Sequence, residues 1–506
     1  MGASRRAPTV TGFAMVLAAS FLSGCVTAPV KPGGPDFDSS FAMGDYHSAA
    51  MAAQEHGGFG PDDGRSGDLL WSLKAGSALY ADGQVDRALK VFDQTEDHFK
   101  IYDEESVFKQ YVLNNVAATL VNDNVLDYRG QLYDATMVNT YKALGFLAVG
   151  NWEFARVELN RAMDRQRRAA DFFAEEIKSQ QEEVEKKKGS NPDANLDQGM
   201  KVFDERLSAV YTTMDQWEVY PDFVNPLVSY LQGVFLLTRA VDGSDLQKSA
   251  DAFKEAYGMN PGNAALASDL KLADAVASGR KSLSAVDPSV WVLVENGLGP
   301  VKESTRIDIP AVLIAPNGNI AYLGIAYPNL KFRDAAYESF AVYDGGTLLG
   351  HTEVVADVDR LVSTEFKKRF RGIITRAVIS AMLKTAMQAE LAKKHGAMGK
   401  FVGALYQLAT TRADTRIWSA LPKDFQAVRV PRPASGILTV VAGDGSSVQI
   451  EVPHSQFCLI HVRAPQPGVT LRGHAIAMDE IGRATIAGNR GRDSVVANSA
   501  YQGVPQ

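Results

Sequence analysis

The sequence predicts a multi-domain α + β protein: an all-α helical solenoid comes first, followed by an α+β domain with an antiparallel sheet and a long helical hairpin. Two observations support this. Apolar residues recur at helical spacing from about residue 40 to 280, and from about residue 283 β-branched runs with Asn-Gly and Asp-Gly turns replace them. Of the 506 residues, 46% are hydrophobic and 22% charged, which is typical of a globular chain with several domains.

Residues 1–24 are predicted to be a signal peptide. Arg5 and Arg6 precede the apolar run "GFAMVLAASFL", which is shorter than the ~20 residues that span a bilayer. The run leads into "LSGC", which resembles the lipobox of bacterial lipoproteins. That resemblance implies cleavage before Cys25 and attachment of fatty acyl chains, such as palmitate, to this cysteine. The alternative is an ordinary secretory signal in which the cysteine is incidental.

The residues after Cys25 predict where an anchored chain would reside. Val26 and Thr27 stand where the lipoprotein pattern has an aspartate for inner-membrane retention, so the resemblance implies an outer-membrane lipoprotein that faces the periplasm. The Pro/Gly-rich residues 25–39 are expected to form a flexible tether between lipid and body. A formal net charge of −7 argues against nucleic acid as a partner.

The helical half, residues 40–282, contains three similar units. They are "WSLKAGSALYADGQVDRALKVFDQ", "TYKALGFLAVGNWEFARVELNRAM" and the more degenerate "SYLQGVFLLTRAVDGSDLQKSADAFKEAYGMNPGNAA". Small, glycine and aromatic residues recur in them at the spacing of a tetratricopeptide repeat, in which small residues let two antiparallel helices pack closely. Three units are about the minimum that buries a continuous core. A generic helical bundle is the alternative interpretation.

A charged segment, residues 171–216, interrupts these units. Glu182 with Lys186 and Glu183 with Lys187 are spaced to support a solvated helix, which "GSNPD" should end. A solvated helical excursion is the favoured interpretation, and an arm that binds a partner is the alternative.

The second half is predicted to be one α+β domain, residues 283–478, followed by a disordered tail, residues 479–506. Strands are expected in "SVWVLVENG", around Asp344-Gly345-Gly346 and around Asp444-Gly445. Between them a helix from residue 364 to about 395 should pack against a second helix near residues 399–410. Cys458 lies in a predicted buried strand, where a small core hydrophobe is its expected role.

Three motifs taken together resemble an uncharacterised family of bacterial lipoproteins. They are "TYKALGFLAVGNWEFARVELNRA", "WVLVENGLGPVKE" and "ADTRIWSALPKDFQAVRVP", and the resemblance covers about residues 40–465. It implies a tetratricopeptide N-terminal half, an α+β C-terminal half, and genes near those of lipoprotein activators of peptidoglycan synthases. It names no reaction.

The sequence lacks several common catalytic signatures. The metalloprotease pattern H-E-x-x-H, the hydrolase pattern G-x-S-x-G and nucleotide-binding glycine loops do not occur, so we expect no enzyme, no cofactor and no metal. An enzyme that acts on glycan or peptide stays an outside alternative, because the carboxylate pair of a glycoside hydrolase has no sequence signature. Two polar clusters remain candidate sites: Glu295, Asn296, Lys302 and Glu303 in the first, and Asp414, Arg416 and Trp418 in the second. A loop held in place inside the C-terminal domain, a loop staple, is the favoured interpretation, and a grip on a ligand is the alternative.

The sequence therefore predicts an outer-membrane-anchored scaffold of the cell envelope. Its repeats would bind envelope proteins in assembly or in the regulation of peptidoglycan synthesis, with Asn139, Tyr141 and Lys142 as contacts on the concave face of the second unit. The alternative is an accessory subunit of an export or surface-assembly apparatus that docks through its C-terminal domain.

Overall fold

The computed structural model describes residues 36–58, 68–100, 103, 128, 130–190, 196–310, 322–374, 413–479 and 485–487. Helices occupy the chain up to residue 285 and strands begin at Ser289, which confirms a mixed α+β fold. The signal peptide, Cys25, most of the tether and most of the tail lie outside the described residues. So do residues 375–412, which contain most of the predicted helical hairpin.

The helical half is a series of helices, most of which pack against their neighbours in the chain. Their bounds are α2 (Phe37–Ala42), α3 (Tyr46–Gly57), α4 (Leu69–Ala81), α5 (Val85–Phe99), α7 (Leu132–Ala148), α8 (Trp152–Ser190), α9 (Leu196–Asp215), η4 (Pro221–Phe223), α10 (Pro226–Thr238), α11 (Gly243–Met259), α12 (Ala264–Ala277) and η5 (Leu283–Ala285). Several begin at a capping side chain: Asp68 accepts a hydrogen bond from the backbone N–H of Trp71, and Asn263 accepts one from that of Leu266.

Three helical hairpins correspond to the three predicted units: α4 with α5, α7 with α8, and α10 with α11. Glycines make the close contacts. A Cβ at Gly76 would lie 2.5 Å from a ring carbon of Phe92, and one at Gly233 would lie 2.9 Å from a ring carbon of Phe253. The hairpins also contact one another in order, α5 against α7 and α8 against α10.

The first helix of each hairpin lies in the interior. Every residue of α7 and α10 is buried, as is nearly all of α4, whereas α5, α8 and α11 have an exposed face. A helix that is apolar on all sides needs a second layer to cover it. The C-terminal half of the chain supplies that layer.

Two sheets and a ribbon form the C-terminal half. The strands are β1 (Ser289–Asn296), β2 (Val301–Pro310), β3 (Tyr322–Lys331), β4 (Ala341–Asp344), β5 (Thr347–His351), β6 (Glu353–Asp357), β7 (Asp424–Pro431), β8 (Ile437–Val441), β9 (Ser447–Glu451), β10 (Phe457–Ala464), β11 (Arg472–Ala477) and β12 (Thr485–Ala487). The orders are β12-β11-β10-β1-β7-β6 and β5-β4-β8-β9, with β2-β3 as a separate pair.

The predicted antiparallel sheet is found in the four-stranded sheet, whose pairs are all antiparallel, whereas the six-stranded sheet is mixed. β1 pairs antiparallel with β7 on one side but parallel with β10 on the other. The tail prediction also changes in part, because residues 485–487 form β12 against β11.

Alternation along β1 shows how the layers are arranged. Val290, Val292 and Val294 belong to the core shared with the four-stranded sheet, whereas Trp291 and Leu293 belong to the core shared with the helices. The molecule is thus built in three layers: helices, six-stranded sheet and four-stranded sheet. One continuous apolar core joins the helical half to the first face of the large sheet.

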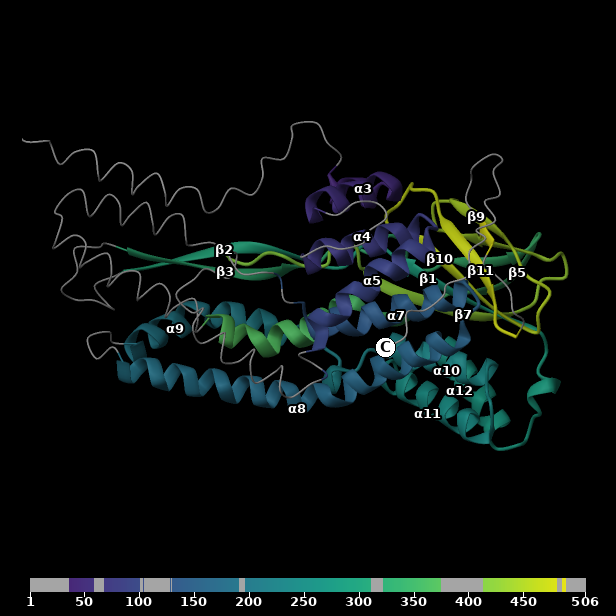
Figure 1. The fold of residues 1–506 in the computed structure, drawn as a ribbon, viewed down its shortest axis with the longest axis horizontal. Helices are drawn as coiled ribbons and strands as arrows, with labels where there is room; N and C mark the ends of the chain where they lie inside the picture. The colour runs from purple at the N-terminus through teal and green to yellow at the C-terminus, as the bar shows by residue number, and fades with distance from the viewer. Residues whose placement is uncertain are drawn as a thin grey trace, which may run out of the picture.

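An arm extends to the left of these layers in Figure 1. It consists of the distal part of α8, α9, the ribbon β2–β3 and a helix at residues 358–374, which is the described part of the predicted long helix. The ring centroids of Tyr211 on α9 and Phe370 lie 5.9 Å apart, as do those of Tyr327 on β3 and Phe370. α8 runs unbroken to Ser190, so the first part of the charged segment prolongs a helix of the second unit, and α9 follows before the third unit begins.

Among the described residues, no helix combines the length and the apolar character that crossing a membrane requires.

Candidate functional site

Glu295 and Asn296 are neighbours on β1 and therefore point to opposite faces of the large sheet. Glu295 faces the helices, where it pairs with Arg463 on β10 and accepts a hydrogen bond from the Tyr141 hydroxyl at 3.2 Å. Asn296 faces the other way and donates to the carbonyl oxygen of Tyr337 at 2.8 Å. The predicted pair thus contributes to two separate contacts, one on each side of the sheet.

The Glu295 side forms a polar centre between sheet and helices. His461 Nε2 lies 2.9 Å from Glu295 Oε1, and the Tyr80 hydroxyl on α4 lies 3.0 Å from His461 Nδ1 and 3.5 Å from His474 Nε2. Burial raises the pKa of Glu295, but the charge of Arg463 and the neighbouring hydrogen bonds outweigh burial and hold this pKa below its usual value. Burial, with the charge of His461, lowers the pKa of His474 to about 3.

The three residues predicted to contact a partner lie inside the molecule. Asn139, Tyr141 and Lys142 are 0%, 1% and 2% exposed. Lys142 Nζ lies 2.8 Å from a carboxylate oxygen of Glu158, and Asn139 Oδ1 accepts a hydrogen bond from Arg165 at 2.7 Å. In this structure Asn139 and Lys142 hold α7 to α5 and α8, whereas Tyr141 contacts the large sheet, so none of the three is accessible to a partner.

The second cluster is divided between two contacts. Arg416 binds Asp414 through two nitrogens, at 2.8 and 2.9 Å, and its main-chain carbonyl accepts a hydrogen bond from Lys302 Nζ at 3.2 Å. Trp418 turns away from Arg416 and donates from Nε1 to Ser77 Oγ on α4 at 2.9 Å. These contacts favour the loop staple over a ligand grip.

Glu303 lies apart from both clusters. Its carboxylate pairs with Lys331 at 2.7 Å across the exposed ribbon β2–β3.

Asp269 on α12 is an interior residue that the sequence did not single out. Its carboxylate is fully buried and accepts hydrogen bonds from Arg429 at 2.7 Å, Trp291 at 3.2 Å and Tyr230 at 3.3 Å. Burial raises its pKa, against the opposing charge of Arg429. The one indication in the sequence was Trp291, because its large indole lies on the strand face that packs against the helices.

Cys458 lies on β10 within the core between the two sheets, as expected of a small hydrophobe. Burial raises the pKa of its thiol to about 12. Over the ranges that the structure describes, no group of three or more His, Cys, Asp or Glu side chains is placed to hold a metal ion.

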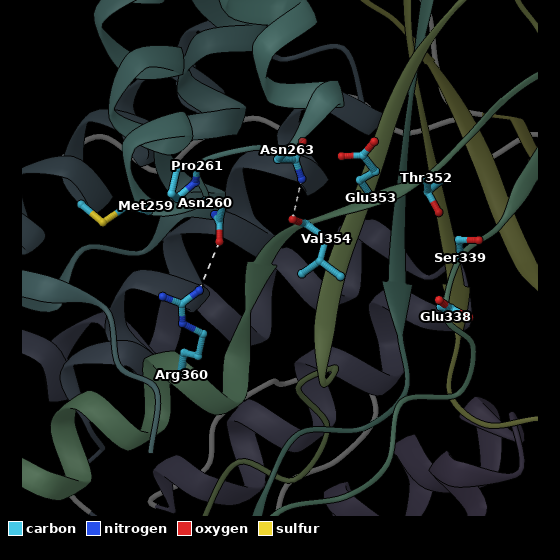
Figure 2. Close-up of a pocket in the computed structure, with 10 residues that line it drawn as sticks. All are labelled: Met259, Asn260, Pro261, Asn263, Glu338, Ser339, Thr352, Glu353, Val354 and Arg360. Carbon is cyan, nitrogen blue, oxygen red and sulfur yellow. Dashed lines mark hydrogen bonds between the residues drawn. The ribbon is translucent and has the colours of Figure 1, made fainter. Parts of the chain in front are cut away.

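A surface pocket of about 560 Å³ lies where the chain passes from one sheet to the other. β5 belongs to the small sheet and β6, directly after it, to the large one, with Thr352 between them. Figure 2 shows the residues that line the gap left beside β6: Met259, Asn260, Pro261, Asn263, Glu338, Ser339, Thr352, Glu353, Val354 and Arg360.

Side-chain amides cover the edge of β6 at this pocket. Asn263 Nδ2 donates to the carbonyl oxygen of Val354 at 2.8 Å, and Asn260 Nδ2 donates to that of Val355 at 2.9 Å. An uncovered sheet edge is a template for pairing with another chain. The two asparagines of the α11–α12 turn occupy these carbonyls and so block that pairing.

The chain was compared with protein-family models, curated proteins and solved structures, and none of them matches it.

Proposed function

We propose that the protein is a lipid-anchored scaffold of the bacterial cell envelope, held at the periplasmic face of the outer membrane through Cys25. The "LSGC" sequence supports the anchor. The observation that carries the scaffold is the set of three stacked hairpins, each with a small or glycine residue against an aromatic or aliphatic side chain of its neighbour, as in tetratricopeptide repeats. On this proposal the partner is an envelope protein.

The partner would bind outside the predicted concave face. That face is covered by the large sheet, and Tyr141 on it is bound to Glu295. The arm is the accessible alternative, because α8 and α9 carry exposed charged residues there, among them Glu175 and Glu205. A projecting arm also suits a tethered protein that must reach a partner at a distance from the membrane.

The second candidate, an accessory subunit of an export or surface-assembly apparatus, is favoured by a different surface. Leu348 on β5 and Ile437 on β8 are 47% and 40% exposed. These two exposed apolar side chains are the candidate docking surface of the small sheet on this second proposal. On this proposal the small sheet docks and the helices act as a spacer.

One experiment tests both proposals. A photo-crosslinking amino acid would be placed in living cells at Glu175 or Glu205 on the arm, at Leu348 or Ile437 on the small sheet, and at exposed Lys254 on α11 as the control position. The scaffold predicts a defined envelope protein captured from the arm, and loss of this product in a Cys25→Ala chain. Capture from Leu348 and Ile437 alone would favour the accessory subunit. Equal labelling from Lys254 and the arm would contradict the scaffold.

A further inference from the structure

The pocket beside β6 has opposite charges on its two sides. Arg360 and Asn260 lie on one side of Val354, and Glu338, Ser339 and Glu353 lie on the other (Figure 2). The volume of about 560 Å³ is within the range of ~300–1,000 Å³ that small-molecule sites occupy.

The Arg360 side chain is held in place, and its guanidinium still has N–H groups that can donate to a ligand. Its guanidinium lies 4.1 Å from the ring centroid of Tyr220, and one terminal nitrogen donates to Asn260 Oδ1 at 3.3 Å. Its Nε is buried and forms an ion pair with the Glu218 carboxylate at 3.7 Å without a hydrogen bond, so the terminal nitrogens are the donors that a ligand can reach. A positioned guanidinium with free donors is suited to a carboxylate, which it can bind through two parallel hydrogen bonds.

The carboxylates on the acidic side of the pocket also have oxygens available to a ligand. Glu353 Oε2 accepts a hydrogen bond from the backbone N–H of Ala264 at 2.7 Å, which fixes this side chain at the rim and leaves Oε1 available. The Glu338 side chain is exposed, and neither it nor Glu353 is in an ion pair among the described residues. Each of these carboxylates is suited to pair with an ammonium group.

We propose that this pocket binds a short zwitterionic peptide, with its carboxylate on Arg360 and its ammonium group on the acidic side, at Glu338 or Glu353. The covered edge of β6 supports a short ligand held by its ends. A long peptide that added a strand would need the carbonyls of Val354 and Val355, which Asn263 and Asn260 already occupy. The proposal goes beyond the scaffold function and does not depend on it.

Isothermal titration of the full chain in detergent tests the proposal. The probe is trialanine with both ends free, compared with the N-acetylated and the C-amidated tripeptides. We expect saturable one-site binding of the free tripeptide with a Kd below about 1 mM, and at least tenfold weaker binding when either end is blocked. Absence of saturable binding, or equal binding of the blocked peptides, would overturn the proposal.

Variants assign each end of the ligand. Arg360→Gln should bind the free and the C-amidated tripeptide equally, and Glu338→Gln with Glu353→Gln should bind the free and the N-acetylated tripeptide equally. Glu451→Gln is the matched control, because Glu451 is exposed on β9 and outside the pocket. If circular dichroism shows that Arg360→Gln is unstable, Arg360→Lys replaces it in the test, because lysine keeps the charge but cannot form the bidentate hydrogen bonds. A double Glu variant that still distinguishes the N-acetylated peptide would contradict the assignment.

Discussion

Glu295 on β1 and Arg463 on β10 occupy paired positions of two parallel strands, and their side chains form an ion pair buried between the sheet and the helices. Tyr141 on α7 donates to the same carboxylate, so the pair also joins the helical half to the sheet. Removing one partner of a buried pair leaves an uncompensated charge in the interior, which is far more costly than the pair is worth.

Arg463→Met should therefore lower the free energy of unfolding by about 3–5 kcal/mol in urea denaturation. Lys331→Met is the control. It breaks the exposed pair with Glu303 across the ribbon and should cost less than about 1 kcal/mol. The double variant Glu295→Leu with Arg463→Met should be more stable than Arg463→Met alone, because no charge is left unpaired. Equal losses in the Arg463 and Lys331 variants would show that the buried pair has no special role.

Substitutions of Trp418 test whether its loop holds the helices to the sheet. Its side chain is 1% exposed, and its ring centroid lies 5.8 Å from that of Tyr141. Trp418→Ala should cost about 3–5 kcal/mol through the cavity it leaves. Trp418→Phe keeps an aromatic ring but loses the hydrogen bond to Ser77, worth about 0.5–1.5 kcal/mol. Thermal unfolding followed by circular dichroism measures both, and a Trp418→Ala chain as stable as the parent would exclude the proposed staple.

Two helical glycines make a matched pair for the hairpin contacts. Gly76→Ala places a Cβ within 2.5 Å of the Phe92 ring and should destabilise the fold by about 1–3 kcal/mol. Gly258 on α11 has no atom within 4 Å of the position a Cβ would take, so Gly258→Ala should stabilise by up to about 1 kcal/mol through helix propensity. Urea unfolding measures both. A neutral or stabilising Gly76→Ala would mean that α4 and α5 do not pack as closely as described.

The local sequence pattern predicted the helical hairpins well, but it predicted poorly how the helices and sheets stack into layers. The small-residue spacing located all three hairpins, because it reports contacts between helices adjacent in the chain. The parallel pairing of β1 with β10 joins residues more than 160 positions apart and has no local signal. The burial of α7 had a partial local signal, because apolar side chains recur around most of "LYDATMVNTYKALGFLA". Asn139 and Lys142 instead led to the prediction of a solvent-exposed face. Their charged partners lie on other helices, so the local sequence does not show that these polar side chains are buried.

The pocket shows the same limit. Asn260, Glu338 and Arg360 come from a helix–helix turn, a loop and a helix that are distant in sequence, and none lies in a recognisable motif. What brings them together is the change of sheet between β5 and β6, which depends on strand pairing across the whole C-terminal half.

His474 should make stability depend on pH in a definite direction. Its pKa is about 3 in the folded state, below the usual histidine value of 6.5. Between these values the unfolded chain binds the proton and the folded chain does not, so the stability falls as the pH falls from about 6.5 toward 3. Asp134 and Asp424 have their pKa raised to about 7 by burial and act in the opposite direction. A comparison with a variant is needed to isolate the histidine.

His474→Phe provides that comparison, because it keeps a ring beside Tyr80 but cannot titrate. The two aspartates are present in both proteins, so their contributions cancel in the difference. Between pH 7 and pH 5 the wild-type chain should lose about 2 kcal/mol of unfolding free energy relative to the variant, as one buried histidine with this pKa requires. Urea denaturation at both pH values measures the difference. Parallel pH dependence in the two proteins would mean that His474 accepts a proton in the folded state, and hence that the polar centre around Glu295 admits water.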